Sequence, residues 1–435
     1  MSRFQAPRGM RDLTPEIAAA FDVAAASIAG RALRYGYARL ETPAIEDVQV
    51  FIRSSGETSD VAGKEMYEAV LHGEGGLALR PEGTAPVARA YLEHGMHRLP
   101  QPVRLFYLET MWRGQRPQLG RWRQFWQWGL ECFGAPDPVA DVEIVEFSDA
   151  AFRELGLTEY ELELNTIGDG KCRAKVRDGL RAYFEPFRDR LSDDSRRRLD
   201  TNVLRVLDSK EERDQDIVKG APRIVELLCE EDIAHFDAVK SGLERLGVAF
   251  VINDRLVRGL DYYTRTVFEF ILTNEKFKGR RLSVAGGGRY DGLLETMGGP
   301  PTAGTGVAGG VDVLLLALET QGVTPPIDIA PQVYVISNAT DDGADRLQLA
   351  TQLRAAGFRT AIDYSRRSLD KQLESAAKHG ARVAIIRGTP EARGGNVVVR
   401  DLRSGEQRVT RLNALLTVVA SHLGVPNPRG KGPDA

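Results

Sequence analysis

All four tryptophans of this 435-residue chain lie within one short stretch, WRGQRPQLGRWRQFWQW, which runs from Trp112 to Trp128. Successive side chains of a β-strand point to opposite faces of a sheet, so the part from Arg121 to Phe133 can be divided by parity. The even positions are mostly apolar, whereas the odd positions carry most of the hydrogen-bonding groups. They are Trp122, Gln124, Trp126, Trp128, Leu130 and Cys132 on one side, and Arg121, Arg123, Phe125, Gln127, Gly129, Glu131 and Phe133 on the other. The pattern predicts a strand with one apolar and one polar face.

The preceding run, VRLFYLETMWR, predicts a partner strand, and the seven residues GQRPQLG between the two runs are typical of a hairpin loop. The polar face of this hairpin would present two arginines, an amide and a carboxylate, namely Arg113, Arg121, Gln127 and Glu131. Such groups need compensating partners when they are buried, so they favour a charged, zwitterionic or phosphate-bearing ligand. The tryptophans by themselves are most simply explained as core side chains.

The length of the chain exceeds the size at which a single hydrophobic core keeps growing, so two or three domains are expected. The apolar content of 42% is ordinary for a folded protein. The first residues, MSRFQAPRGMRDLTPE, contain no apolar signal segment. No stretch reaches the roughly 20 apolar residues that a membrane helix needs. We therefore expect a soluble, cytoplasmic protein that has no membrane partner.

The cysteines and histidines predict neither a disulfide framework nor a metal centre. Cys132, Cys172 and Cys229 are three in number and far apart in the sequence, and they form no CxxC pair. The six histidines show no metal-binding spacing such as HExxH. No protein-bound metal is expected.

The proline-rich run QGVTPPIDIAP predicts a linker at 321–331. Residues 332–425 then alternate between strand-like and helix-like runs, which predicts a small α/β domain with a largely parallel sheet. Its strands are expected at QVYVIS, FRTAID and ARVAIIRG, and its helices at DGADRLQLATQLRAAG and SLDKQLESAAKHG. With 14 lysines and arginines against 9 acidic residues, this region is the better candidate for contact with a polyanion. Residues 426–435 are expected to be a disordered tail.

Residues 1–320 lack this alternation. A helical pattern near 14–35 is followed by strand-like runs, many of which alternate in polarity as in an antiparallel sheet with one buried face. These runs are at 76–80, 103–113, 121–133, 160–165, 263–272 and 282–285. Between them, residues 170–247 are helical in pattern and highly charged, which predicts a helical insertion into the sheet domain. The fold class expected for the whole chain is α+β.

Three further segments contain candidate site residues, each with a structural alternative. In LALRPEGTAPVARA, Arg80, Glu82 and Thr84 surround a turn ahead of a helix, although Glu and Thr are also ordinary capping residues. In LVRGLDYYTRTVFEF, Arg258 precedes two tyrosines and a strand, and it is equally well explained as a solvated charge. AGGGRYDGL has neither P-loop nor dinucleotide-turn spacing, and its three glycines indicate either a close backbone approach or a tight turn.

In order and spacing, these segments resemble the histidine–tRNA ligases, a family of class II aminoacyl-tRNA synthetases. TPAIE near the amino terminus and the later GTGVAGGVDVLLLAL belong to the same resemblance, which covers about residues 5–424. It implies a catalytic domain at 1–320, built on an antiparallel sheet with a helical insertion at about 170–247, and an anticodon-binding-like α/β domain at 332–425. It also implies a homodimer.

The resemblance implies a two-step reaction. ATP, with Mg²⁺, first activates L-histidine to histidyl-adenylate, and the histidyl group is then transferred to the 3′ end of tRNA(His). The residues implied to bind histidine are Glu82, Gly83, Thr84, Gln127, Glu131, Arg258, Tyr262 and Tyr263. Those implied to bind ATP are Arg113, Gln115 and Arg121, of which Arg113 would act in catalysis together with Arg258. Arg116 and Gln118 are implied to meet the acceptor end of the tRNA.

The chain departs from the family pattern only on the ATP side or behind the sheet. Where the family has a glutamate and an arginine that holds the γ-phosphate, this chain has Asp312 and Val313. The family glutamate beside adenine is Gln115, and the histidine of its QFHQ sequence is Trp126. A lost charge-assisted contact to phosphate costs on the order of 1.5–3 kcal/mol. Compensation by another cation, such as Arg289, is one possibility that the sequence leaves open.

Two other functions are consistent with this pattern. One is a non-catalytic histidine-binding paralogue, such as a regulatory subunit of ATP phosphoribosyltransferase, which would keep the histidine pocket and lose ATP contacts. Such relatives typically lack the anticodon-binding domain, so the ligase is favoured. The other is a plain tRNA-binding module, which would fit the basic terminal domain but would not need a complete amino-acid pocket.

Overall fold

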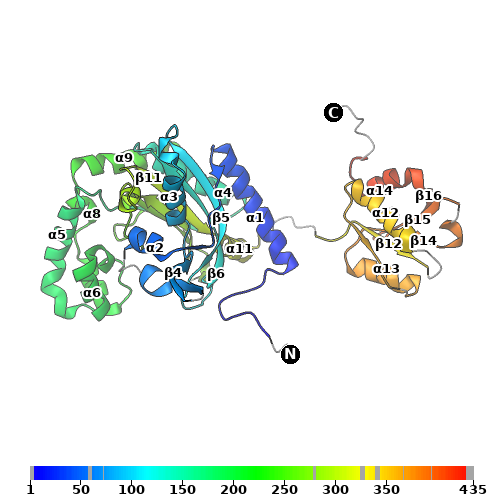
Figure 1. Cartoon of the computed structure of the whole chain (residues 1–435), viewed down its shortest axis with the longest axis horizontal. Coiled ribbons are helices and arrows are strands. Elements are labelled where there is room, and N and C mark those ends of the chain that lie inside the picture. Colours follow the sequence, from blue (N-terminus) through cyan, green and yellow to red (C-terminus); the bar gives the residue numbers. More distant parts are fainter. Residues whose placement is uncertain are drawn as a thin grey trace. The chain divides into compact units, whose positions relative to one another are not determined.

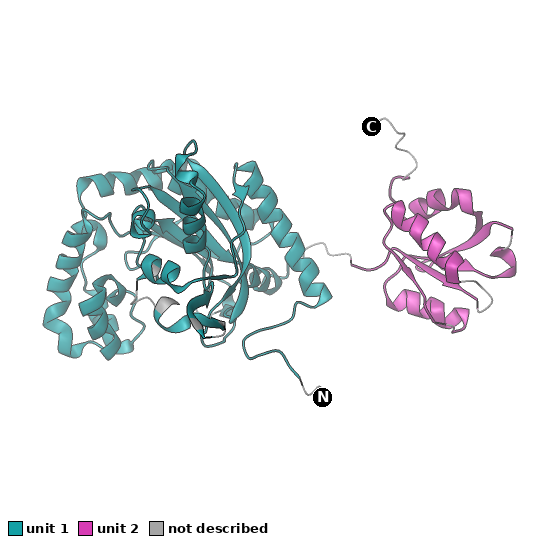
Figure 2. Cartoon of the chain, in the orientation of Figure 1, with its two compact units in different colours: residues 1–327 teal, residues 328–435 magenta. Residues whose placement is uncertain are grey.

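The computed structural model describes most of the chain, which divides into two compact units at 1–327 and 328–435 (Figure 2). The described residues are 4–56, 61–71, 73–277, 281–323, 329–338, 343–365, 367–392 and 394–427. Most of the predicted tail and the middle of the predicted linker therefore lie outside the described residues. Within these ranges, no helix has the length and apolar content needed to span a bilayer.

Unit 1 is built on an eight-stranded sheet in the order β1-β5-β6-β11-β10-β9-β7-β8 (Figure 1). The six central strands pair antiparallel, and only the short edge strands β1 and β8 pair parallel. The bounds are β1 Ala38–Arg39, β5 Val103–Trp112, β6 Gln124–Phe133, β7 Tyr160–Thr166, β8 Val251–Ile252, β9 Thr264–Leu272, β10 Ser283–Arg289 and β11 Gly304–Gly310. The antiparallel sheet predicted from alternating polarity is confirmed.

The two faces of this sheet pack against different elements. One face packs against α1 (Pro15–Arg34), α4 (Val139–Glu154) and α11 (Val311–Thr320), with the side chains of Trp128, Leu130 and Cys132 in the shared core. The other face packs against α3 (Thr84–Glu93) and helices of the 170–247 region. A small antiparallel sheet of β2 (Ile45–Asp47), β4 (Glu74–Leu79) and β3 (Tyr67–Leu71), with α2 (Val48–Ser55), lies next to α3.

The parity prediction for the tryptophan strand holds from Gln124 onward. Trp128 is fully buried on the apolar side, and Trp126 packs there edge-on against Phe21 at 5.5 Å between ring centroids. Trp122 is an exception, because β6 begins two residues after it. Its side chain lines the cavity described below rather than the core, so the prediction that it packs behind the hairpin was wrong.

Five α-helices lie between β7 and β8 and form a side lobe on the sheet (Figure 1). They are α5 Arg173–Phe184, α6 Asp193–Thr201, α7 Glu212–Lys219, α8 Ile224–Leu227 and α9 Glu230–Arg245. The core of this lobe is continuous with the core on the polar face of the hairpin, since Val176, Leu180 and Leu204 belong to the same cluster as Tyr107 and Phe133. Helices α5 to α8 therefore pack on the side of the sheet that carries the polar face of the hairpin, whereas α9 packs against α4 on the opposite side.

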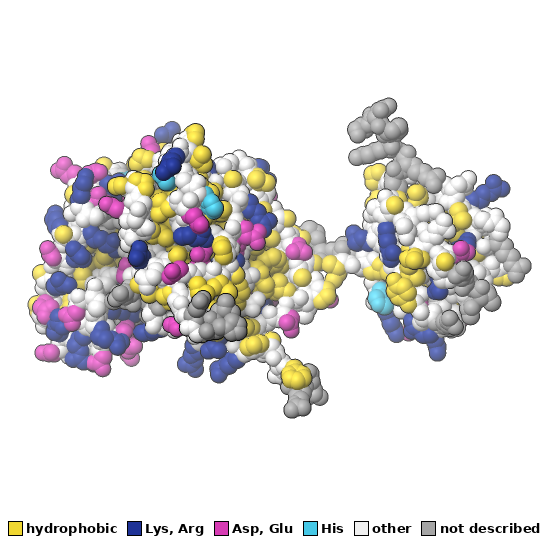
Figure 3. Space-filling model, in the orientation of Figure 1, with side chains coloured by type: hydrophobic (Ala, Val, Ile, Leu, Met, Phe, Trp, Pro, Cys, Tyr) yellow, Lys and Arg dark blue, Asp and Glu magenta, His cyan; other side chains and the backbone are white. Residues whose placement is uncertain are grey.

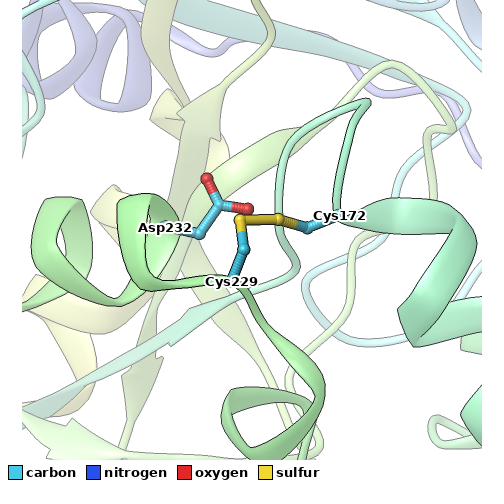
Figure 4. Close-up of side chains that lie close together, drawn as sticks. All are labelled: Cys172, Cys229 and Asp232. Atoms are coloured by element: carbon cyan, nitrogen blue, oxygen red, sulfur yellow. A yellow bond between two sulfur atoms is a disulfide. The ribbon is translucent and has the colours of Figure 1, made fainter.

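A disulfide joins Cys172 and Cys229, so the prediction that no cysteines would pair was wrong. The two residues are 57 positions apart, but each immediately precedes a helix, α5 or α9, and their Cα atoms are 6.0 Å apart. Separation in the sequence did not indicate this pairing, because the helices of the lobe bring the chain back beside the start of α5. The carboxylate of Asp232 lies beside the bridge (Figure 4) and accepts hydrogen bonds from Nε of Arg265 and the backbone N–H of Asp169, both at 2.8 Å.

Unit 2 contains a five-stranded sheet in the order β13-β12-β14-β15-β16, with helices α12 (Gly343–Ala355), α13 (Leu369–Lys378) and α14 (Leu415–Leu423). The three predicted strands, β12 Val333–Ser337, β13 Thr360–Ile362 and β14 Val383–Arg387, pair parallel. The strands β15 (Asn396–Asp401) and β16 (Gln407–Arg411) add an antiparallel hairpin that the sequence did not indicate. On the face drawn in Figure 3, the charged side chains of this unit are mainly basic.

Candidate active site

A cavity of about 1040 Å³ lies on the polar face of the hairpin in unit 1. Its walls come from the hairpin and its loop, the start of α3, the glycine-rich strands β10 and β11, and residues 207–210 and 253–263. Most predicted site residues line it, namely Glu82, Thr84, Arg113, Gln115, Gln118, Arg121, Gln127, Arg258, Tyr262 and Tyr263. Gly83, Arg116 and Glu131 are not among the described residues that do so.

The glycines of β10 and β11 leave room for the polar side chains of the cavity. A Cβ atom on Gly286 would lie 2.6 Å from Nη1 of Arg258, and one on Gly306 would lie 2.2 Å from Oε2 of Glu131. A Cβ atom on Gly287 would lie 2.0 Å from the carbonyl oxygen of Gly306. The three successive glycines thus serve a close approach within a strand, and the alternative of a tight turn is wrong.

Glu82 caps a helix, as one of the two sequence-based explanations predicted, and its side chain also lies at the cavity. Its carboxylate accepts the backbone N–H groups of Thr84 and Ala85, at 2.7 and 2.9 Å, and so caps the first turn of α3. The same side chain lines the cavity, and its burial raises the pKa of the carboxyl group. A capping carboxylate is therefore held rigidly where an incoming ligand would meet it.

Glu131 lies one layer below the cavity surface. It is 1% exposed, and its carboxylate accepts the hydroxyl of Thr84 at 2.7 Å and the hydroxyl of Tyr290. Burial is the largest cause that raises the pKa of Glu131 to about 8, although both hydrogen bonds oppose it. Thr84 and Tyr290 line the cavity directly and separate Glu131 from it.

Gln127 is oriented by a buried tyrosine. Its Oε1 accepts the backbone N–H of Gly83 at 3.2 Å and the hydroxyl of Tyr107 at 3.3 Å. The ring of Tyr107 is 0% exposed and lies between Gly83 and Gly129, where a Cβ atom on either glycine would be 2.3 Å from it. Gly83 therefore contributes its backbone N–H to Gln127, and its lack of a side chain leaves the space that the ring of Tyr107 fills.

Arg258 is a half-buried, ion-paired residue rather than a solvated charge. Its Nη1 donates to Oε1 of Glu269 at 2.8 Å, and its guanidinium carbon lies 5.7 Å from the ring centroid of Tyr263. Glu269 also pairs with Arg281 at 3.1 Å, so one carboxylate connects two cations at the cavity wall. The ring of Tyr262 packs against those of Tyr263 and Tyr290.

The hairpin arginines differ in their surroundings. Nε of Arg113 donates to the carbonyl of Pro81 at 2.7 Å, and its guanidinium lies over the ring of Phe125 at 5.2 Å. Burial lowers the pKa of Arg113, while the nearby carboxylates of Glu65 and Glu82 oppose this shift. Arg121, in contrast, is exposed on the hairpin loop.

Three of the four residues that depart from the family pattern lie at the hairpin-loop end of the cavity, and the fourth, Trp126, packs behind the sheet. Nε2 of Gln115 donates to the carbonyl of Trp122 at 2.8 Å, and Asp312 and Val313 line the wall at the start of α11. Arg289 cannot compensate for Val313, because its side chain is 0% exposed and pairs with Asp141.

Sequence reasoning missed several residues that line the cavity or contact its lining. Tyr290 and Glu269 lie in motifs that were noted, GGGRYDGL and LVRGLDYYTRTVFEF, but no local pattern indicates their partners. Tyr107 occupies a position of β5 with no polar signal beyond its own hydroxyl. A fourth, Arg11, pairs with Asp312 across 301 positions.

Comparison with known proteins gives consistent results for both units. The family model described as histidyl-tRNA synthetase matches residues 9–169, and the one described as an anticodon binding domain matches residues 332–422. A histidine–tRNA ligase of Desulforamulus reducens is 41% identical over 413 residues, which cover 95% of this chain and 98% of that protein. One of Pelotomaculum thermopropionicum is 42% identical over 410 residues, which cover 94% and 96%.

A solved structure agrees with these sequence matches. The apo histidyl-tRNA synthetase of S. aureus superposes with a TM-score of 0.81 at 32% identity, covering 96% of this chain and 99% of that one. The resemblance seen in the motifs is thereby confirmed over nearly the whole chain. The chain belongs to the histidyl-tRNA synthetase family.

Proposed function

We propose that this protein is an ATP-dependent histidine–tRNA ligase, which forms histidyl-adenylate and transfers the histidyl group to the 3′ end of tRNA(His). The observation that carries the proposal is that one cavity contains both hydrogen-bond acceptors and cationic groups. Buried hydrogen-bond acceptors, Glu82 and Gln127, line the same space as the guanidinium groups of Arg113 and Arg258. An amino acid and a nucleotide phosphate require this combination.

The carboxylate of Glu82 and the amide oxygen of Gln127 are suited to the α-ammonium group of histidine, which offers only donors. Glu131, together with Tyr290 and Thr84, is proposed to recognise the imidazole ring. The ring has one N–H donor and one acceptor nitrogen, so it matches a carboxyl group beside a hydroxyl. A side chain without those atoms would leave buried polar groups unpaired, and the site would reject it.

In the first step an oxygen of the histidine carboxylate attacks the α-phosphorus of ATP, and the bond to pyrophosphate breaks. Arg258 and Arg113 are proposed to hold the attacking carboxylate and the α-phosphate and to stabilise the charge that develops. Arg258 retains free N–H donors while it is paired with Glu269, because a guanidinium carries five. Mg²⁺ would enter with ATP, and cavity carboxylates such as Glu65 and Glu269 are the oxygen donors that this ion prefers.

The tRNA is proposed to approach along the hairpin loop and to contact unit 2. Arg116 and Gln118 are exposed on that loop, and Gln118 also lines the cavity. The basic side chains of unit 2 are suited to the anticodon arm. A homodimer acting in the cytoplasm is part of the proposal and rests on the family resemblance.

A second candidate is a histidine-binding paralogue that forms no adenylate. The observation in its favour is the nucleotide end of the cavity, where Val313 offers no charge and the neighbouring Asp312 is an anion. Both candidates require the histidine end of the cavity, so histidine binding alone does not separate them.

Histidine-dependent exchange of pyrophosphate into ATP separates the two. Exchange far above a blank without histidine, followed by histidine transfer to tRNA(His) transcript, is the result expected for the ligase. Histidine binding in a calorimeter without any exchange would refute the ligase and support the paralogue. Alanine substitution at Arg258 is the matched control, since it should remove exchange from the same preparation.

A further inference from the structure

The segment ahead of α1 packs against the hairpin loop. The backbone N–H of Met10 donates to the carbonyl of Pro7 at 2.9 Å, and that of Arg123 donates to the carbonyl of Gly9 at 2.7 Å. Gly9 has a φ of +86°, and a Cβ atom there would lie 2.7 Å from Cγ of Pro117. This close fit determines where the next arginine, Arg11, is placed.

The side chain of Arg11 contacts two residues that line the cavity near the hairpin loop. Its Nη2 donates to Oδ1 of Asp312 at 2.5 Å, and its guanidinium carbon lies 4.4 Å from the ring centroid of Trp122. The other carboxylate oxygen of Asp312 accepts the backbone N–H of Trp126 at 2.8 Å. The side chain of Asp312 is 1% exposed and that of Arg11 is 29% exposed, so the arginine covers an otherwise buried carboxylate.

The charge of this carboxylate matters because of its position. Asp312 lines the cavity together with Trp122, Arg121 and Val313, which is the end proposed above for the phosphates of ATP. A buried carboxylate without a cation would repel a polyphosphate, because attraction and repulsion between charges are strong where water is excluded. Among the described residues, Arg11 is the cation that pairs with Asp312.

We propose that Arg11 is a positioning residue for ATP. It neutralises Asp312 and holds the ring of Trp122, and the wall beside Val313 thereby accepts the polyphosphate tail. The inference rests on the proposed function for the identity of the ligand. It assigns a role in nucleotide selection to the segment ahead of α1, which lies outside the hairpin and outside the glycine-rich strands β10 and β11.

The test is a double-mutant cycle between Arg11→Ala and Asp312→Asn, with Arg11→Lys as the conservative variant and Lys175→Ala as a control. Lys175 is an exposed cation on α5, so its loss changes the net charge equally without touching the cavity. The KM values for ATP and for histidine are measured separately in pyrophosphate exchange. Thermal unfolding of every variant reports the fold.

Arg11→Ala should raise the KM for ATP by about tenfold or more and leave the KM for histidine within about twofold. Adding Asp312→Asn should restore most of the ATP affinity, because it removes the uncompensated charge. Arg11→Lys should stay close to the wild type. Three results would overturn the proposal: an unchanged KM for ATP in Arg11→Ala, a parallel rise in both KM values, or no rescue by Asp312→Asn. The ion pair between Arg11 and Asp312 would then have a structural role only.

Equilibrium dialysis with labelled MgATP repeats the cycle without catalysis. If the wild type binds ATP but catalyses no exchange, the proposed function fails while the Arg11 cycle still decides this inference. If the wild type binds no ATP, the role of Arg11 in nucleotide selection is refuted as well.

Discussion

The two ends of the cavity are built differently. At the end proposed for histidine, Glu82, Gln127 and Glu131 are all less than 10% exposed and accept hydrogen bonds from within the protein. At the end proposed for the phosphates, Arg121 is exposed on a loop and Asp312 is neutralised by a residue from a distant segment. The first end is a connected network of hydrogen bonds, and the second is a set of charges.

This difference accounts for the position of the departures from the family pattern that line the cavity. A buried hydrogen bond needs a particular atom within about 3 Å, so replacing one partner leaves the other unsatisfied. A charge acts over a longer distance and can be supplied from another element. Gln115, Asp312 and Val313 all lie at the end where charge, rather than a specific hydrogen-bond partner, is the main requirement.

Arg258 stands between the two ends, and its removal should have the largest effect. Arg258→Ala is expected to lower the exchange rate at saturating substrates by about 10²–10³-fold, because it removes a charge that the proposed mechanism places at the reacting groups. Arg258→Lys should recover part of the loss, since the pairing with Glu269 can be kept. Rates close to the wild type for the alanine variant would remove Arg258 from catalysis.

Glu131→Ala tests the histidine end by itself. Histidine binding should weaken by about 100-fold or more, because the hydroxyls of Thr84 and Tyr290 lose their shared acceptor along with the ligand. ATP binding should be unaffected, and calorimetry with each ligand measures the two separately. Unchanged histidine affinity in a folded variant would refute the assignment of the imidazole pocket.

The disulfide should matter more to the histidine end than to the phosphate end. Arg173, next to Cys172, donates to the carbonyls of Tyr263 and Asp261, at 2.9 and 3.3 Å, and so anchors the loop that carries the pocket tyrosines. Replacing both cysteines by serine should lower the free energy of unfolding by about 2–4 kcal/mol.

In the same variant, the KM for histidine should rise several-fold more than the KM for ATP. Wild-type protein treated with a dithiol reductant should reproduce the change, and Cys132→Ser, which lies outside the bridge, serves as the control. Equal changes in both KM values would show that the bridge stabilises the unit without favouring one end.

Val313→Arg tests the phosphate end. An arginine at this wall should lower the KM for ATP by up to about tenfold and leave histidine binding unchanged. If Arg11 already supplies all the compensation that the site needs, the improvement will appear only in the Arg11→Ala background. A rise in the KM for ATP in both backgrounds would show that a valine side chain is required there.

The smallest effect concerns the pH dependence of stability. Burial raises the pKa of Glu131 from 4.5 to about 8, so in this window the folded protein holds a proton that the unfolded chain has released. Stability from this group is therefore fully present below pH 4.5 and is lost as the pH rises towards 8. Relative to Glu131→Gln, the wild type should lose about 1 kcal/mol of unfolding free energy between pH 6 and pH 7. Urea titrations of both proteins at each pH measure the unfolding free energies. A difference between the two proteins that stays constant with pH would contradict the raised pKa of Glu131.

Much of the site could be located from the sequence because its signals are local. The parity of β6 places Gln127 and Glu131 opposite Trp126 and Trp128, since alternation depends only on the backbone of one strand. The turn before α3 and the loop before β9 carry recognisable motifs. Tyr107 and Glu269 could not be assigned in the same way. What they do depends on the residues that they contact, Gln127 and Arg258, and no local pattern indicates these contacts.

The sequence by itself determined the antiparallel sheet, the helical lobe between its strands, the hairpin with its polar face and the motifs that line the cavity. Only the tertiary structure decided the bond between Cys172 and Cys229, the bridge of Glu131 to Tyr290 and the pairing of Arg11 with Asp312. The physical reason is that strand alternation and helical periodicity are properties of neighbouring residues. Contacts across 57, 159 or 301 positions depend on how whole elements pack, and no local pattern encodes that packing.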